Sequence, residues 1–141
     1  VRVIHLYFSD PWPKSRHHRR RVVQDRFLAE ALRVLMPGGE VRIVTDHDEL
    51  WAWDCAHFAD WAEDPDRLLK PEDIERGRGD AEQARTATNL RPATKPFVMV
   101  PFQKAAGAEE GELVGTNFER KYRREGRVFR AVVLKTRGQG Y

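Results

Sequence analysis

A single carboxylate, Asp10, separates an apolar segment from the densest group of positive charges in the chain. Residues 7–21 read YFSDPWPKSRHHRRR. The Pro-Trp-Pro run after the acid restricts the backbone and places an aromatic plane beside the carboxylate. A carboxylate next to an aromatic face suits a flat heterocycle that carries N–H donors, such as guanine. The alternative interpretation is that Asp10 starts a turn and binds no ligand.

A cluster of positive charge follows the acid immediately. Its members are Lys14, Arg16, Arg19, Arg20, Arg21 and Arg26. The helical pattern begins near residue 19, and cations are unfavourable at a helix N-terminus because the macrodipole there prefers anions. An anionic polymer would account for these cations, since Arg, Lys and the free N–H groups of a helix N-terminus bind phosphate. The cluster therefore favours contact with nucleic acid over a solvated charged face.

The histidines and the cysteine do not indicate a metal site. His17 and His18 are adjacent, so they point in different directions, and no Cys or His stands at ligand spacing from them. We interpret both as phosphate or packing contacts. Cys55, the single cysteine, lies among apolar residues and is interpreted as a packing residue. One cysteine forms no internal disulfide, which predicts a reducing compartment such as the cytoplasm.

Strand, helix and strand patterns surround the acid and the cationic cluster. Residues 1–9 are a continuous apolar, β-branched and aromatic run, typical of a strand buried on both faces. Apolar residues recur at helical spacing between residues 19 and 35, and residues 40–46 have the pattern of a second strand. Together they predict a βαβ unit, in which the two strands are parallel.

Asp10 and Asp46 end these two strands. Ligands of an open parallel sheet bind beyond the carboxyl ends of its strands, and neighbouring strands lie about 5 Å apart. We therefore expect both carboxylates to face one crevice. A second interpretation of Asp46 has equal weight. Asp46 and Glu49 have the spacing of a capping box, which would start a helix over residues 48–62.

The rest of the chain contains fewer signals. Residues 65–115 are polar and charged over a length that suggests a functional loop or an insertion, although residues 97–102 have a strand pattern. Residues 116–126 predict a short helix or turn, and residues 127–136 predict a final strand.

Composition limits the class of protein. The 141 residues suffice for one domain with its own core, and 40% hydrophobic with 33% charged residues is typical of a soluble globular protein. No apolar run approaches the ~20 residues of a membrane helix, and no signal peptide is visible, so we expect no membrane partner. A net charge of +3 is too small to indicate nucleic acid by itself.

Two segments resemble a known family. Residues 6–53 resemble the tRNA (guanine-N7)-methyltransferases of the S-adenosylmethionine-dependent class. The family pattern there is a strand, Pro-Asp-Pro-Trp, a lysine, a His/Arg/Lys cluster, a helix, Pro-Gly-Gly, and a strand that ends in Thr-Asp. Residues 116–135 resemble the family's C-terminal Thr-Lys-Phe-Glu segment and final strand. Ser9 and Asn117 stand where the family pattern has proline and lysine.

The resemblance implies roles for individual residues. Asp10 is expected to be the catalytic acid at the methyl-transfer centre, where it also borders the cofactor. Lys14 and Asp46 are expected to contact the substrate. The expected RNA-binding residues are Arg16, His17, His18, Arg19, Arg20 and Arg21. The expected substrate-binding loop comprises Thr116, Asn117, Phe118 and Glu119.

The implied fold is α/β, the C-terminal half of a Rossmann-like methyltransferase, with a mostly parallel sheet and an antiparallel C-terminal strand. The chain begins at Val1 within a strand pattern and has no glycine-rich loop after a strand and before a helix. We therefore expect residues 1–141 to be the substrate-side part of a single methyltransferase domain, without most of the S-adenosylmethionine site. Such a piece is expected to be inactive when isolated.

The expected reaction is transfer of a methyl group from S-adenosylmethionine to N7 of guanine in tRNA, without a metal, by a monomer or homodimer in the cytoplasm. One alternative is a non-catalytic RNA-binding module, which cofactor binding by the whole protein would exclude. The other is an amino-methyltransferase that acts on adenine or cytosine. Its Asp-Pro-Pro-Tyr-type motif has one proline more than Asp-Pro-Trp.

Overall fold

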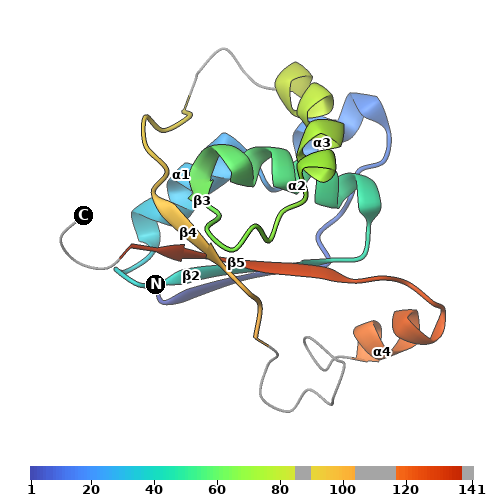
Figure 1. Cartoon of the computed structure of the whole chain (residues 1–141). Helices are drawn as coiled ribbons and strands as arrows, with labels where there is room; N and C mark the ends of the chain where they lie inside the picture. The colour runs from blue at the N-terminus through green and yellow to red at the C-terminus, as the bar shows by residue number, and fades with distance from the viewer. Residues whose placement is uncertain (85–89, 104–116, 138–141) are drawn as a thin grey trace.

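The described residues form one five-stranded mixed sheet in the computed structural model, in the order β1-β2-β5-β4-β3 (Figure 1). The structure describes residues 1–84, 90–103 and 117–137. The strands are β1 (Val3–Tyr7), β2 (Glu40–Thr45), β3 (Ala62–Glu63), β4 (Phe97–Val100) and β5 (Arg130–Thr136). The β1–β2 and β3–β4 pairs are parallel, whereas β5 is antiparallel to both β2 and β4. The sequence therefore predicted the α/β class, the parallel β1–β2 pair and the antiparallel final strand. The predicted mostly parallel character of the sheet is not confirmed, because two of the four strand pairs among the described residues are antiparallel.

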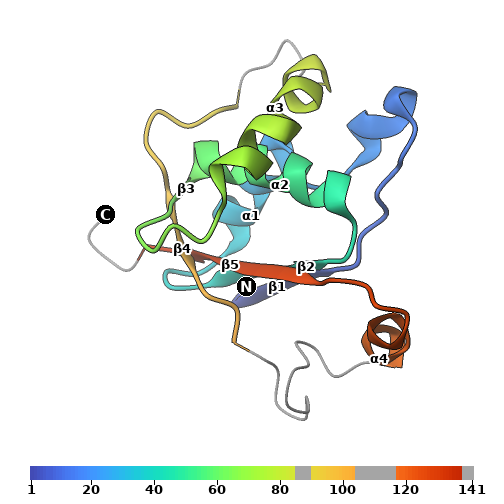
Figure 2. The same cartoon turned by 45° about the vertical axis from the view of Figure 1, so that its right-hand side comes forward.

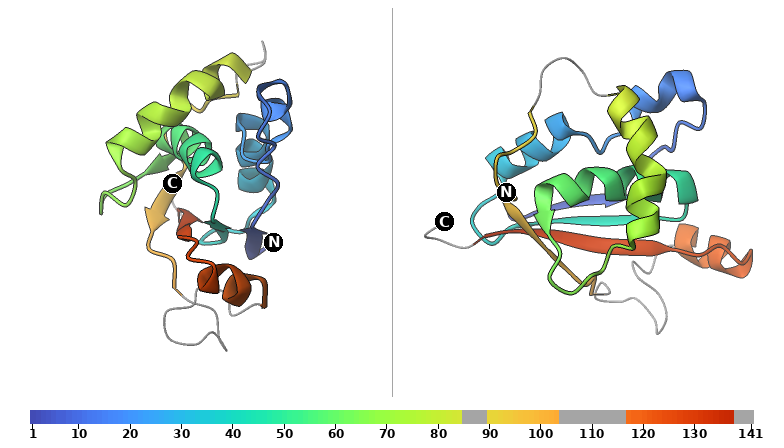
Figure 3. Two further views of the ribbon diagram at one scale, coloured as in Figure 1. Left: turned by 90° about the vertical axis from the view of Figure 1, so that its right-hand side faces the viewer. Right: turned by 45° about the horizontal axis from the view of Figure 1, so that its top comes forward.

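Helices cover the sheet unequally. The described helices are η1 (Ser15–Arg20, a 3₁₀-helix), α1 (Asp25–Val34), α2 (Asp48–Trp61), α3 (Pro71–Ala84) and α4 (Asn117–Arg124). Figures 1 and 2 show α1, α2 and α3 on one side of the sheet, and α4 on the other side near the start of β5. In both views of Figure 3, α3 lies over α2 and beside η1. None of the described helices combines the length and the apolar composition that crossing a membrane requires.

The single helix predicted over residues 19–35 is two helices. The 3₁₀-helix η1 ends at Arg20, and α1 begins five residues later, at Asp25. Gln24, directly before α1, donates from its side-chain amide to the carbonyls of Arg19 and Arg21. The first turn of α1 contains Asp25 and, next to it, Arg26. The argument that cations open a long helix was therefore wrong, because Arg16, Arg19 and Arg20 lie in the separate helix η1, whose last turn is basic, and only Arg26 of the cluster lies in α1.

Strand β1 was expected to be buried on both faces but forms one edge of the sheet. Its residues are half-buried, apart from an exposed His5, because only β2 pairs with it. Residues 65–115, expected to be a functional loop or an insertion, contain the helix α3, which was not predicted, and the strand β4, which the pattern of residues 97–102 predicted. The pattern of α3 is hard to recognise because polar and charged residues fill most of its exposed positions.

The core lies between the sheet and the helices. Val41 and Ile43 of β2 contribute to it together with Val132 and Leu134 of β5, and α2 supplies residues around its whole circumference. A helix that is buried all round must be covered on two sides, and here the sheet and α3 do so.

Gly77 makes the close packing of α3 on α2 possible. A Cβ atom at residue 77 would stand 1.9 Å from the carbonyl oxygen of Ala52, in the backbone of α2. A Cβ atom at Gly79, two residues along the same helix, would meet nothing within 4 Å. Gly77 is therefore required by helix packing, whereas Gly79 is not.

We expect Gly77→Ala to lower the free energy of unfolding by about 3 kcal/mol, since overpacking against backbone forces α3 away from α2. The matched control, Gly79→Ala, should raise it by about 0.5–1 kcal/mol, because alanine loses less backbone entropy in a helix. Denaturant unfolding of both variants measures these changes. Equal effects in the two variants would contradict the close approach of the two helices.

Candidate functional site

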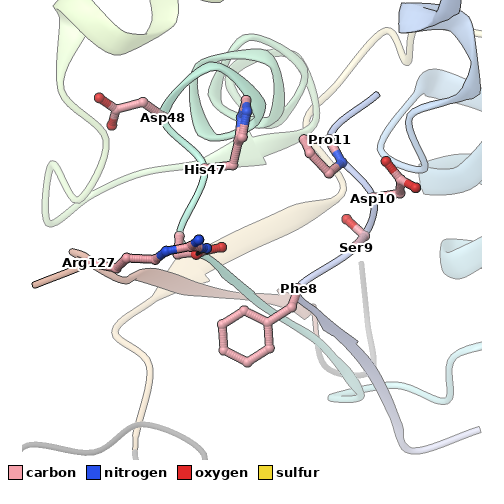
Figure 4. Close-up of a pocket in the computed structure, with 8 residues that line it drawn as sticks. Phe8, Ser9, Asp10, Pro11, His47, Asp48 and Arg127 are labelled. Carbon is pink, nitrogen blue, oxygen red and sulfur yellow. Dashed lines mark hydrogen bonds and ion pairs between the residues drawn. The ribbon is translucent and has the colours of Figure 1, made fainter. Parts of the chain in front are cut away.

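A pocket opens where β1 and β2 end. Its volume is about 630 Å³. Its lining residues are Phe8, Ser9, Asp10, Pro11, Asp46, His47, Asp48 and Arg127 (Figure 4). The parallel register of the two strands explains this arrangement. Tyr7 stands beside Val44, so the segments that follow the two strands leave the sheet side by side. The pocket is therefore at the carboxyl edge of the β1–β2 pair, as the sequence predicted.

The segment after β1 is bent sharply. The Phe8 amide donates to the carbonyl of Val44 at 2.8 Å, and Phe8 has φ 56°; Trp12 has φ 43°. Side chains other than glycine rarely adopt this left-handed region, and such residues persist only where surrounding contacts hold them. Strained residues concentrate at functional sites, so two of them on either side of Asp10 support this segment as a site.

The Asp10 carboxylate itself is exposed and takes part in the turn. Its Oδ1 accepts a hydrogen bond from the backbone amide of Trp12 at 2.9 Å, which is an Asx-turn. In Figure 4 the carboxylate points away from Arg127 and His47. The structure thus brings Asp10 and Asp46 to one pocket, but their carboxylates do not converge. The turn interpretation of Asp10 agrees with the observed hydrogen bond.

Asp46 is paired with a cation that the sequence did not identify as a site residue. Its Oδ2 accepts from Nη1 of Arg127 at 2.6 Å, and only 13% of the Asp46 side chain is exposed. Asp48 forms an ion pair with Arg130. The strand topology could have located both arginines. Because β5 is antiparallel to β2, the residues at its start lie beside the carboxyl end of β2.

The capping box predicted for Asp46 is wrong. His47 is the N-cap of α2, and its Nδ1 accepts from the Leu50 amide at 3.1 Å. Asp46 lies one residue outside the cap and bonds to Arg127 instead. The helix therefore starts without Asp46, which remains a pocket residue.

The cationic cluster divides into an outer and an inner set. Lys14 precedes η1 as its N-cap and is exposed, like Arg16, Arg19 and Arg20. The guanidinium of Arg20 lies 5.1 Å from the centre of the half-buried Trp12 ring, which His17 contacts edge-on. We call the four exposed cations Lys14, Arg16, Arg19 and Arg20 the outer cationic group.

His18 and Arg21 are the inner set, and both are buried. Burial lowers the pKa of Arg21, and the carboxylates of Asp80, Glu49 and Asp54 oppose this shift. Burial likewise raises the pKa of Asp54 well above its usual range, and Arg21 opposes that shift. Direct RNA contact, predicted for both His18 and Arg21, does not agree with their burial, since a phosphate would have to enter the core to reach them.

The C-terminal motif is described only in part. Thr116 lies outside the described residues, and Asn117 and Phe118 are placed only as the first residues of α4. Glu119 is fully buried, and its Oε2 accepts from Nε of Arg123 at 3.4 Å.

Helix α4 is linked to the pocket by a chain of ring contacts. The guanidinium of Arg123 stacks on Phe129, and Phe129 meets the pocket residue Phe8 edge-on at 5.5 Å between ring centres. The motif carried by α4 is therefore connected to the segment that carries Asp10.

Other chemistries have little support within the described residues. No group of three or more His, Cys, Asp or Glu side chains there could hold a metal ion. Cys55 is buried in the core, and burial raises the pKa of its thiol far above the usual range. A thiolate is the nucleophilic form, so Cys55 serves packing. The pocket thus offers carboxylates and one guanidinium for binding and positioning a ligand.

The described residues form an α/β fold with a pocket at the carboxyl edge of parallel strands, beside exposed cationic side chains. Residues 1–96 match the family described as "Putative methyltransferase", and the chain belongs to this family.

Curated relatives carry the name tRNA (guanine-N(7)-)-methyltransferase. That of Bradyrhizobium diazoefficiens is 44% identical over 98 residues, which are 62% of this chain and 42% of the relative. That of Nitrobacter hamburgensis is 54% identical over 56 residues, 40% of this chain and 22% of the relative. That of Rhodopseudomonas palustris is 46% identical over 74 residues, 48% of this chain and 29% of the relative. The family resemblance inferred from the sequence is confirmed, and the chain spans less than half the length of these relatives.

The start of α2 gives a direct test of the roles of Asp46 and His47. We expect His47→Ala to lower the free energy of unfolding by about 1 kcal/mol, because the Leu50 amide loses its acceptor. Glu49→Ala should change it by no more than about 0.5 kcal/mol. Denaturant unfolding compares the two variants. A larger loss in the Glu49 variant would restore the capping box.

Proposed function

We propose that this chain is the substrate side of a tRNA (guanine-N7)-methyltransferase, which transfers a methyl group from S-adenosylmethionine to N7 of guanine in tRNA in the cytoplasm. The observation that carries the proposal is the adjacency of two features on one short segment. A pocket with carboxylates opens at the end of β1, and the outer cationic group begins four residues after Asp10. The family and the names of the relatives support the same reaction.

The chemistry of guanine suits carboxylates in the pocket. N7 carries an in-plane lone pair, so no base need remove a proton before methylation. The purine offers N–H donors to a carboxylate, and methylation leaves positive charge on the ring. A fixed negative group nearby stabilises that charge as it develops. Asp10 is suited to this task because the Trp12 amide fixes Oδ1, while Oδ2 has no hydrogen bond in the described part of the chain.

Asp46 and Arg127 are proposed to position the nucleotide. Asp46 is mostly buried at the pocket wall and accepts from Arg127, so its carboxylate is held in one orientation. We assign it the second contact with the base, and Lys14 a contact with the adjoining backbone. Fixing the base relative to the methyl donor supplies much of the rate in such reactions. Thr116, Asn117, Phe118 and Glu119 retain their assignment as substrate-binding residues by resemblance alone. The last three lie in α4 rather than in a loop.

The methyl donor needs more protein than these residues provide. S-adenosylmethionine supplies the methyl group in this class. Of the described residues around the pocket, Asp10 alone is assigned to border it. We propose that residues 1–141 are one part of a single Rossmann-like methyltransferase domain, and that further strands pair with β1. Support comes from β1 itself, an edge strand whose Ile4 and Leu6 are only half-buried.

The outer cationic group is proposed to bind the tRNA backbone. Arg16, Arg19 and Arg20 are exposed, and Trp12 adds an aromatic surface next to Arg20. Arginine next to an aromatic ring is typical of surfaces that bind single-stranded RNA through phosphate contacts and base stacking. The same surface would serve a non-catalytic RNA-binding module, so the chemistry of Asp10 decides between the two functions.

Asp10→Asn keeps the size of the side chain but removes its charge and offers N–H₂ toward the donors of guanine. In the whole enzyme that contains this chain, we expect the single-turnover methylation rate to fall by ~10²–10³, which is typical for one preorganised electrostatic group. Affinity for tRNA should stay nearly unchanged, since phosphate contacts provide most of it. Asp66→Asn, at an exposed position outside the pocket, is the control.

Folding of the Asp10 variant is checked by its unfolding curve, because Asp10 also accepts from the Trp12 amide. A parent-like methylation rate in a folded Asp10→Asn enzyme would show that Asp10 is not the catalytic acid. If the parent enzyme binds tRNA but transfers no methyl group to guanine, the RNA-binding module replaces the enzyme as the proposed function.

Replacing Arg19 and Arg20 together by alanine should weaken tRNA binding and reduce its salt dependence. At ~0.7–0.9 per phosphate contact, the slope of log affinity against log salt should fall by roughly 1.4 to 1.8. The control is Arg33→Ala, which removes an exposed cation from the last turn of α1, beside the amino end of β2. An unchanged slope in the double variant would make the outer cationic group a solvated face.

A further inference from the structure

The 3₁₀ geometry of η1 places buried and exposed side chains on different faces. A 3₁₀-helix has three residues per turn, so residues three apart lie on the same face. His18 and Arg21 are three apart and are both buried, with Arg21 directly after the helix and 1% exposed. Arg16 and Arg19 repeat the same spacing on an outer face, where both are exposed.

The two inner side chains bind carbonyl groups of the Asp10 segment. Nε of Arg21 donates to the carbonyl of Pro11 at 2.7 Å. Nε2 of His18 lies 3.3 Å from the carbonyl oxygen of Pro13. Proline has no N–H group, so this stretch has few amides with which to fix itself in a regular structure. The side chains of His18, in η1, and Arg21, directly after it, hold the backbone of the Asp10 segment instead.

Helices α2 and α3 hold the inner side chains in turn. The guanidinium of Arg21 lies over the buried ring of Trp53, 5.2 Å from its centre. Nδ1 of His18 lies 3.6 Å from the carboxylate of Asp80 on α3. The Arg21 charge is also near Asp54, and neither its Nη2 nor Oδ1 of Asp54 has a hydrogen-bond partner among the described residues. A buried guanidinium with an unused donor is costly, which argues that its remaining contacts serve a purpose.

We propose that Arg21, assisted by His18, is a positioning residue that fixes the Asp10 carboxylate by holding the Pro11 carbonyl. Pro11 lies between Asp10 and Trp12, and Trp12 supplies the amide that fixes Asp10. The left-handed backbone of Trp12 needs such external support, since it is unfavourable by itself. The positioning of a catalytic acid rests on the function proposed above, whereas the holding of the segment does not.

The test compares Arg21→Met with Arg19→Met, which removes an exposed cation from the same run. Hydrogen exchange of the assigned Trp12 amide is followed by NMR in the full chain, with the amides of Val132 and Leu134 in β5 as references. Arg21→Met should accelerate exchange at Trp12 by about ten- to a hundredfold, as expected for loss of a hydrogen bond from a charged donor. The exchange rates of the two reference amides should stay unchanged in Arg21→Met. Arg19→Met should leave the exchange rates of all three amides unchanged.

A second readout separates positioning from RNA contact. In the whole enzyme, Arg21→Met should lower the single-turnover methylation rate while leaving the salt slope of tRNA binding at the parent value. Arg19→Met should instead lower the salt slope of tRNA binding by ~0.7–0.9. If the parent proves to be a binding module, the exchange result still tests the holding of the segment.

Arg21→Lys is the second variant, because it keeps a positive charge among Asp54, Glu49 and Asp80 while losing the planar guanidinium fork. The Trp12 amide of Arg21→Lys should exchange faster than that of the parent and slower than that of Arg21→Met. Unchanged exchange at Trp12 in both Arg21 variants would overturn the proposal. Equal acceleration at Trp12 and in β5 would also overturn it, since Arg21 would then stabilise the core as a whole. A lower salt slope in Arg21→Met would make Arg21 an RNA contact.

Discussion

The parallel pairing of β1 with β2 is the constraint on which the site depends. It places the ends of both strands at one edge, so that the segments carrying Asp10 and Asp46 leave the sheet together. The antiparallel β5 adds Arg127 and Arg130 at the same edge, because its first residues meet the end of β2. Three segments far apart in sequence therefore supply one pocket.

Helices α2 and α3 stabilise the segments at this edge of the sheet. Helix α2 is buried on all sides because α3 covers it, and the contact of Gly77 with the α2 backbone allows the two helices to approach closely. Trp53 of α2 also lies beneath Arg21, and Asp80 of α3 lies beside His18. The packing of the core and the shape of the Asp10 segment are thus coupled through a small number of buried side chains. This coupling gives α3, none of whose residues lines the pocket, a part in the organisation of the site.

The basic run of the chain combines two tasks. The three-residue repeat of η1 sends His18 and Arg21 inward, while Arg16, Arg19 and Arg20 stay in solvent. In composition the two sets look alike, since arginine and histidine serve both. Their environments differ: the buried inner side chains bind the carbonyls of Pro11 and Pro13, whereas Arg20 of the outer set is exposed and lies over the half-buried Trp12 ring. One cluster of like charges can therefore supply both exposed side chains at the surface and buried side chains that hold the backbone.

The sequence by itself determined the α/β class, the βαβ unit, the antiparallel final strand and the family, because hydrophobic periodicity and a distinctive local string encode them. It also placed Asp10 and Asp46 at the ends of neighbouring strands. Tertiary structure alone decided that β1 is an edge strand, that His47 caps α2, that Arg127 pairs with Asp46, and that Arg21 is buried. The physical reason is that each of these depends on partners distant in the chain, whereas local sequence specifies only the propensity of a segment and the chemistry of its side chains.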